Sequence, residues 1–347
     1  MPAKPSRLMM LDSGAYTAWT QDKVIDVGDY ITYCRTHIDC SHFINLDVIA
    51  GTKHGRPSLA DTNAAADVSW SNYLSMCREL PAAKVIPVYH YGEDLRKLDR
   101  ILSHGCPYIA LGGSAHKSTG LRVKWLQSLR RYLFDGAGRS LVKLHGLALT
   151  SYDLMKLWEW ESVDSTSWKA FATWGAIYLP IERGGGFDYT VSPMIVFTTP
   201  QSKKRDRQQH YETMSPMLKE RMQRWLASCG VGLGTSVNSQ KEVGYKLDVP
   251  GGEIWLDKKR RIMMRPDGGG KGVTNSFEMR ALVNAKLVGR SNKVLPIRHM
   301  YFAGQLVPYH YMEFGFRRRL LSYYYTAQTP SATAYLAEHL RRLREGI

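Results

Sequence analysis

The sequence has few cysteines, and their spacing suits neither a disulfide framework nor a thiolate metal site. The five are an odd number, lie far apart and include no C-x-x-C pair: Cys34, Cys40, Cys77, Cys106 and Cys229. We therefore expect reduced thiols. The chain also lacks an apolar run of about 18 residues, a secretory signal at its N-terminus and a basic stretch with the period of a membrane-lying helix. These absences predict a cytoplasmic protein without a membrane partner.

Acidic residues are scarce relative to basic ones, and the imbalance is local. The 347 residues carry 47 Lys and Arg against 31 Asp and Glu, a formal charge of +16, of which residues 201–347 contribute +14. Basic side chains on phosphates release counterions, so this excess predicts a polyanionic partner, the alternative being a solvated surface. The candidates for nucleic-acid contact are Lys203, Lys204, Arg205, Arg207, Lys258, Lys259, Arg260, Arg261, Arg317, Arg318 and Arg319.

Short apolar runs alternate with helical stretches, and 44% of the residues are hydrophobic, enough for a sizeable core. This alternation predicts parallel strands with helices outside, either a doubly wound sheet or a (β/α)₈ barrel. The predicted strands are 8–11, 43–46, 85–90, 108–113, 141–149, 162–166, 175–181 and 194–200. The predicted helices are 61–80, 93–104, 121–134, 150–160 and 211–228.

The residues at the strand ends favour the barrel. Nearly every strand ends in a polar residue or glycine: Asp12, Asp47, His90, Gly112, Gly113, His145, Gly146 and Asp164. A barrel gathers such ends on one face, whereas a doubly wound sheet would need a G-x-G-x-x-G turn that is absent after residue 11. We expect an α/β fold, a TIM-like (β/α)₈ barrel with a basic C-terminal extension. Residues 1–200 would form the catalytic barrel core, and residues 201–347 a basic nucleic-acid-binding region that partly completes the barrel.

Three of these strand-end residues are aspartates, which suggests chemistry at a sugar or base. One carboxylate can attack an anomeric carbon while a second carboxyl group handles the proton of the leaving group, and a third can read a base. A single strand-end aspartate is about as often the N-cap of the next helix. Three on separate strands, Asp12, Asp47 and Asp164, favour a catalytic site.

Six motifs, in this order, resemble the tRNA-guanine transglycosylases that insert queuine or archaeosine precursors. The first is similar to the DSGG[YF] motif of that family, and the last stands where the family has its nucleophile. They are LDSGAY (11–16), FINLDVI (43–49), PVYHYGE (87–93), YIALGG (108–113), LHGLAL (144–149) and SVDSTSW (162–168).

The resemblance implies a role for each strand-end residue. Asp164 would be the nucleophile on C1′ and Asp12 the acid and base at the departing and incoming bases. Asp47 would accept hydrogen bonds from the guanine N1–H and exocyclic amine. The remaining base contacts would be Tyr16 and His145 stacking on its two faces, the Gly112 and Gly113 N–H groups at its O6 edge, the Gly146 turn, and His90 where the family usually has glutamine.

Besides having His90 in place of the usual glutamine, the sequence differs from the tRNA enzymes in its lack of a zinc site. The tRNA enzymes have a Cys-rich zinc site after the nucleophile, but here only Cys229 follows residue 106, so neither a metal nor another cofactor is expected. The pattern is therefore more similar to the DNA-guanine transglycosylases of 7-deazaguanine DNA modification in bacteria and their phages. The expected partners are DNA and a free 7-deazaguanine base such as the 7-cyano form, in a bacterial cell or a phage-infected host. Exchange on tRNA, and hydrolysis by a purine glycosylase or nucleoside hydrolase, are the alternatives.

Overall fold

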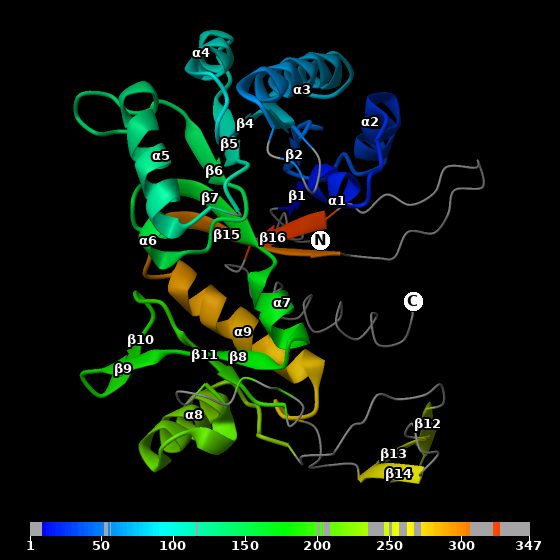
Figure 1. Ribbon diagram of the computed structural model, residues 1–347, viewed down its shortest axis with the longest axis vertical. Helices are drawn as coiled ribbons and strands as arrows, with labels where there is room; N and C mark the ends of the chain where they lie inside the picture. Colours follow the sequence, from blue (N-terminus) through cyan, green and yellow to red (C-terminus); the bar gives the residue numbers. More distant parts are fainter. Residues whose placement is uncertain are drawn as a thin grey trace, which may run out of the picture. The chain divides into compact units, whose positions relative to one another are not determined.

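The chain forms two compact units, which we describe separately (Figure 1). The computed structural model describes residues 9–51, 55, 57–115, 117–199, 202, 204, 209–234, 246–249, 252–256, 262–266, 272–305 and 322–326. Unit 1 comprises the described parts of Met1–Thr166 and Leu295–Ile347, and unit 2 those of Ser167–Val294. Unit 1 is discontinuous in sequence, because a strand after residue 296 pairs with one before residue 166.

Unit 1 is built on a nine-stranded sheet with the order β3-β2-β1-β16-β15-β7-β6-β5-β4. Neighbouring strands run parallel except for β16, which is antiparallel to both β1 and β15. The strands are β1 (Met9–Leu11), β2 (His42–Ile44), β3 (Val85–Ile86), β4 (Val88–His90), β5 (Tyr108–Gly112), β6 (Lys143–Gly146), β7 (Trp160–Ser165), β15 (Ile297–Gln305) and β16 (Ser322–Thr326). The predicted α/β fold with parallel strands is confirmed.

A single residue, Pro87, separates the first and last strands of this order. Proline has no N–H to donate to a strand ladder, and its carbonyl oxygen accepts a hydrogen bond from the Ala110 N–H at 2.9 Å. On one side of Pro87, β3 pairs with β2, and on the other side β4 pairs with β5. Side chains from both ends of the order share one buried cluster: Met10, Ile44, Ile86, Val88, Tyr108, Ala110 and Tyr301.

The helices of unit 1 begin at residues that cap them. Asp26, Ser58, Asp94 and Ser118 each accept a hydrogen bond from a backbone N–H of the first turn. The helices are α1 (Ala15–Thr20), α2 (Val27–Thr36), α3 (Leu59–Glu79), the short 3₁₀ turn η1 (Ala82–Lys84), α4 (Leu95–Ser103), α5 (Thr119–Leu133) and α6 (Tyr152–Met155). Helix α6 is shorter than predicted, because β7 already begins at residue 160.

Unit 2 contains two of the predicted strands in a different role. Strands β8 (Ala176–Leu179) and β11 (Met194–Phe197) pair with each other and run antiparallel, so their prediction as parallel barrel strands is wrong. The chain between them is a hairpin of β9 (Ile181–Arg183) and β10 (Gly186–Asp188), and antiparallel pairing needs no crossover helix.

The remaining elements of unit 2 include one long helix that was not predicted. They are α7 (Ser167–Thr173), η2 (Tyr211–Thr213), α8 (Pro216–Ser228), the three-stranded sheet of β12 (Lys246–Val249), β13 (Gly252–Leu256) and β14 (Ile262–Pro266), and α9 (Phe277–Asn292). The buried Asn284 of α9 accepts from the Tyr178 N–H at 2.6 Å and donates to the Trp168 carbonyl at 2.9 Å. This side chain fastens α9 to β8 and α7. None of the helices that the structure describes is long and apolar enough to cross a membrane.

Candidate active site

The predicted site residues lie at the carboxyl ends of the strands of unit 1. Asp12 follows β1, Asp47 lies three residues after β2, and β4 ends at His90. Strand β5 ends at Gly112, β6 at Gly146, and Asp164 is the penultimate residue of β7. Because these strands run parallel, their carboxyl ends lie along one edge. Contacts among the described residues join the site residues into two groups.

The first group is centred on His90, which lies between two carboxylates. Its Nε2 is 2.8 Å from Asp47 Oδ2, and its Nδ1 is 3.0 Å from Glu93 Oε1. The other oxygen of Asp47, Oδ1, accepts a hydrogen bond from Ser13 Oγ at 3.2 Å. The imidazole and the Glu93 carboxylate are both buried. Asp47 is therefore held from two sides by residues of β4 and of the β1 end.

These contacts make His90 a cation. Burial by itself lowers the pKa of His90, but hydrogen bonds to Asp47 and Glu93 outweigh that effect and raise the pKa to about 10. At neutral pH both ring nitrogens then carry protons, and each donates to a carboxylate. Asp47 and Glu93 share one buried positive charge, which makes the burial of these two acidic side chains tolerable.

Asp12 belongs to this first group. It is partly buried, and its neighbour Ser13 contacts Asp47. The charges of Asp12 and Asp47 both add to the effect of burial in raising the pKa of Tyr30 well above its usual value. Two of the three aspartates are thus close to a common side chain.

Glycines 112 and 113 allow His90 to approach the end of β5. A Cβ atom on Gly113, whose φ is +71°, would lie 2.9 Å from the Cβ of His90. A Cβ atom on Gly112 would lie 3.2 Å from His90 Cδ2 and 3.1 Å from Leu147 Cδ1. A side chain on Gly113 would therefore displace His90, and one on Gly112 would crowd both Leu147 and His90. Gly112 also lies between the first group and the loop after β6, which belongs to the second group.

The second group is centred on the Asp164 carboxylate, which is 4% exposed. Its Oδ1 accepts a hydrogen bond from the Ala148 N–H at 3.0 Å and lies 3.3 Å from His145 Nε2. Within the described part of the chain, both of these contacts fall on Oδ1. Among the described residues, Asp164 is therefore held through one of its two carboxylate oxygens.

His145 continues into a buried chain of hydrogen-bonding groups. Its Nδ1 is 2.5 Å from Ser162 Oγ, which is 2.5 Å from the Tyr108 hydroxyl. The tautomer of His145 sets the direction of its hydrogen bond with Ser162, and either hydroxyl can donate in the Ser162–Tyr108 contact. The His145 ring is fully buried, so it presents no open face to a base in this structure. Its Nε2 instead lies within ion-pair distance of the Asp164 carboxylate.

The other predicted base contacts are more scattered. Tyr16 lies on α1 and is 49% exposed, with its ring 6.0 Å from that of Trp19. Gly146 is tightly packed, because a Cβ atom there would lie 2.9 Å from Leu149 Cβ. Of the basic candidates, Lys204 is described and exposed. The others lie outside the described residues: Lys203, Arg205, Arg207, Lys258, Lys259, Arg260, Arg261, Arg317, Arg318 and Arg319.

Sequence reasoning missed three residues that complete the two groups. Glu93 stands three residues after His90, and Ser13 follows Asp12 directly. Ser162 precedes Asp164 by two positions on β7, and alternate residues of a strand share a face. The two-residue spacing from Asp164 was therefore the sequence feature that could have indicated Ser162. No group of three or more metal-binding side chains occurs among the residues described.

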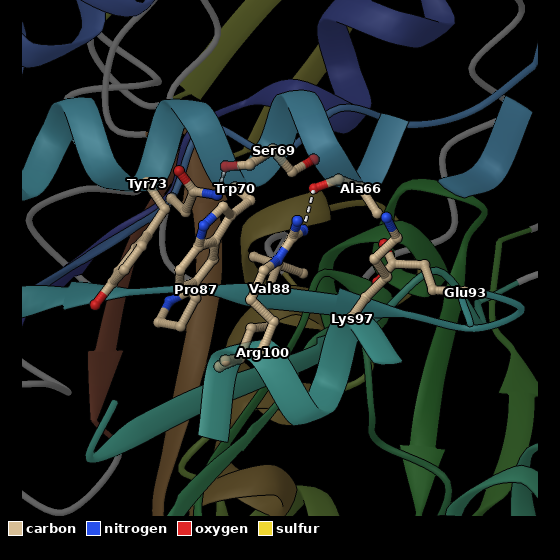
Figure 2. A pocket seen from close by; sticks show the side chains of 11 residues that line it. Ala66, Ser69, Trp70, Tyr73, Pro87, Val88, Glu93, Lys97 and Arg100 are labelled. Carbon is tan, nitrogen blue, oxygen red and sulfur yellow. Dashed lines mark hydrogen bonds between the residues drawn. The ribbon is translucent and has the colours of Figure 1, made fainter. Parts of the chain in front are cut away.

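A small hollow in unit 1 lies away from the predicted site residues (Figure 2). It is found between α3 and α4, beside Pro87 and the adjoining Val88 of β4, where Arg100 reaches the Ala66 carbonyl. Glu93 is the lining residue that also contacts the site, through His90. The lining is formed by Asn45, Ala66, Ser69, Trp70, Tyr73, Pro87, Val88, Glu93, Lys97, Arg100 and Ile101.

Comparisons of the chain with models of protein families, with curated proteins and with solved structures find no match. Its function is therefore inferred from the geometry of the two carboxylate groups and from the order of the sequence motifs.

Proposed function

We propose that this protein is a DNA-guanine transglycosylase, which exchanges guanine in DNA for a 7-deazaguanine base through a covalent intermediate on Asp164. The observation that carries the proposal is the state of the Asp164 carboxylate. It is buried at the end of β7 and held through Oδ1 by a backbone N–H group and by His145. A carboxylate held through one oxygen keeps the other in position to attack a sugar carbon.

We also propose that the strands of unit 1 close into an eight-stranded barrel, in which β3 and β4 are one strand interrupted at Pro87. The shared cluster of Met10, Ile44, Val88 and Ala110 supports closure, because these residues come from both ends of the strand order. In such a barrel seven strands are parallel and β16 is antiparallel. The carboxyl ends of the parallel strands then form one ring, and Asp12, Asp47 and Asp164 share its rim.

The exchange takes two displacements at C1′. In the first, Asp164 Oδ2 forms a bond to C1′ as the C1′–N9 bond breaks, and the bonding electron pair leaves with guanine, which takes a proton from Asp12. In the second, the Asp12 carboxylate removes the N9 proton of the incoming base. N9 then attacks C1′, and the ester bond breaks to restore the Asp164 carboxylate. Two inversions give net retention.

The His90 group is suited to recognise the base. The Asp47 carboxylate keeps lone pairs on both oxygens beyond its bonds to Ser13 and His90, so it can accept from the N1–H and the exocyclic amine of guanine. Facing adenine, the same carboxylate would be left without these donors. A buried acceptor without a partner costs about 1–3 kcal/mol, which discriminates between the purines.

DNA is favoured over tRNA by the sequence, which lacks the zinc module and carries its positive charge in residues 201–347. A target inside a duplex must leave the base stack, and phosphate contacts can offset that cost. If these basic residues lie on phosphates, DNA binding should weaken steeply between about 50 and 200 mM salt. A binding constant that does not change with salt would contradict this assignment.

The deciding experiment supplies isotopically labelled 7-cyano-7-deazaguanine together with either guanine-containing DNA or tRNA, followed by mass analysis of the nucleosides. Label in deoxynucleosides alone supports the proposal. Label in ribonucleosides alone identifies a tRNA enzyme. Release of guanine with abasic sites and no incorporated label identifies a glycosylase. Absence of all three products at DNA-binding concentrations rejects exchange chemistry.

A further inference from the structure

The loop after β6 contains a strained residue that contacts Asp164 directly. Ala148 has a φ of +51°, in the left-handed region that an alanine side chain disfavours. This conformation directs the Ala148 N–H to Asp164 Oδ1 at 3.0 Å. The next N–H group, of Leu149, donates to the main-chain oxygen of Asp164 at 2.9 Å. Two consecutive backbone donors therefore bind the side chain and the backbone of one residue.

A buried arginine holds this loop from the other side. Arg122 on α5 is 8% exposed, and its Nη2 donates to the Ala148 carbonyl at 3.1 Å. Its Nε donates to Ser114 Oγ, also at 3.1 Å. The Ala148 carbonyl and the Leu149 N–H belong to the same peptide group. The guanidinium thus binds one end of that peptide, while its other end binds the backbone of Asp164.

The buried guanidinium of Arg122 has neutral hydrogen-bond partners. Burial lowers the pKa of its guanidinium, and among the described residues no carboxylate lies within ion-pair distance. Burying a cation with only neutral partners is costly. Arg122 donates to two neutral oxygens, one of which is the Ala148 carbonyl. Holding the Ala148 loop rigidly would account for the cost of burying this cation.

We propose that Arg122 is a positioning residue for Asp164, which acts through the left-handed Ala148 peptide. The cation fixes and polarises the 148–149 peptide, the fixed peptide holds φ of Ala148 positive, and the resulting N–H binds Oδ1 so that Oδ2 faces C1′. The role of Oδ2 rests on the proposed function. The stabilisation of the Ala148 loop by Arg122 is independent of the proposed function, and it can be measured separately.

The first test compares Arg122→Gln with Arg280→Gln. Arg280 is the matched control, because it is 7% exposed and also binds backbone carbonyls, those of Ala172 and Val273. With the incoming base withheld, the rate of adduct formation on a guanine oligonucleotide should fall at least about tenfold in Arg122→Gln, with DNA affinity within about twofold. Arg280→Gln should form the adduct at the wild-type rate. Arg122→Lys keeps the positive charge but loses the planar pair of donors, so its adduct rate should lie between those of Arg122→Gln and the wild type.

Hydrogen exchange of the Ala148 and Leu149 amides supplies a readout that is independent of catalysis. Both amides should exchange at least about tenfold faster in Arg122→Gln, and at wild-type rates in Arg280→Gln. If the wild-type protein forms no adduct, the proposed function fails, and this measurement still decides whether Arg122 holds the loop. If the adduct forms but neither its rate nor the two amides respond to Arg122→Gln, the inference is overturned.

A second pair of variants separates positioning from stability. Ala148→Gly removes the left-handed penalty but lets the loop sample other conformations, so the adduct rate should fall several-fold while the melting temperature does not fall. Asp22→Gly is the control, since Asp22 has a φ of +52° in an exposed turn and should leave the adduct rate unchanged. An Ala148→Gly variant with the wild-type adduct rate would show that the strained conformation has no part in positioning Asp164.

Discussion

Asp47, which is partly buried, and Asp164, which is buried, both lie at strand ends of unit 1, yet they are stabilised in opposite ways. Asp47 is paired with a cation, the His90 imidazolium, and both of its oxygens are hydrogen-bonded. Asp164 is held by a peptide N–H and by His145, and the contacts of the described residues fall on one oxygen. A carboxylate engaged at both oxygens is suited to recognise a partner, whereas one with a free oxygen is suited to form a bond. This difference supports the proposal that Asp47 recognises the base and that Asp164 attacks the sugar.

The largest effect should come from Asp164→Asn, which removes the proposed nucleophile with almost no change in volume. Exchange and the denaturation-stable adduct should both fall by roughly 10⁴-fold or more, while DNA binding is retained. Peptide mapping of the wild-type adduct should locate the sugar on Asp164. An adduct on Asp12 or Asp47 would reverse the assignment. The exposed Asp153→Asn on α6 is the matched control and should behave as wild type.

The second effect concerns stability and pH at His90. Its pKa is about 10 in the folded state and near 6.5 in the unfolded chain. The folded state therefore binds the proton more tightly, so this contribution is fully present below pH 6.5 and is lost as the pH rises toward 10. The free energy of unfolding from urea titrations should fall by on the order of 3–5 kcal/mol across that range. His90→Gln should flatten this part of the profile, and an unchanged slope would mean that His90 is neutral.

A smaller effect should follow from Asp47→Asn, because it alters recognition rather than attack. The amide presents a donor where guanine also has a donor, which should lower exchange by about 1–3 kcal/mol in transition-state free energy, or roughly 5- to 150-fold. Steady-state exchange with guanine and its analogues measures this. DNA affinity should stay nearly constant. If Asp47→Asn lost DNA binding instead, Asp47 would have a structural role.

The smallest effect should come from Ser162→Ala, which breaks the hydrogen-bond chain behind His145. Ser162 contacts His145 rather than the Asp164 carboxylate that is proposed to react, so the rate of adduct formation should fall by about tenfold or less, near 1 kcal/mol. Tyr108→Phe should have a still weaker effect, since the Ser162–His145 contact survives. A loss as large as that of Asp164→Asn would mean that the chain transfers protons rather than orienting His145.

The strands of unit 1 were predictable because each buried parallel strand is a short apolar run. The predictions at 43–46, 108–113 and 162–166 fall within two residues of β2, β5 and β7 at each end. Helix α9 escaped prediction because the buried polar residues Arg280 and Asn284 interrupt its apolar period. Strand β15 pairs with β7, which lies more than a hundred residues earlier, and local sequence pattern does not reveal such a pairing.

The sequence by itself determined which chemical groups stand at the strand ends, since a polar residue after a buried strand can be read from the chain. Tertiary structure decided the surroundings of each group. Only the folded chain places His90 between Asp47 and Glu93, turning a strand-end histidine into a cation, and buries His145 against Asp164. Likewise, only the fold brings Arg122 of α5 to the Ala148 loop. Charge state and orientation depend on burial and on partners distant in sequence, and these are set when the strands assemble.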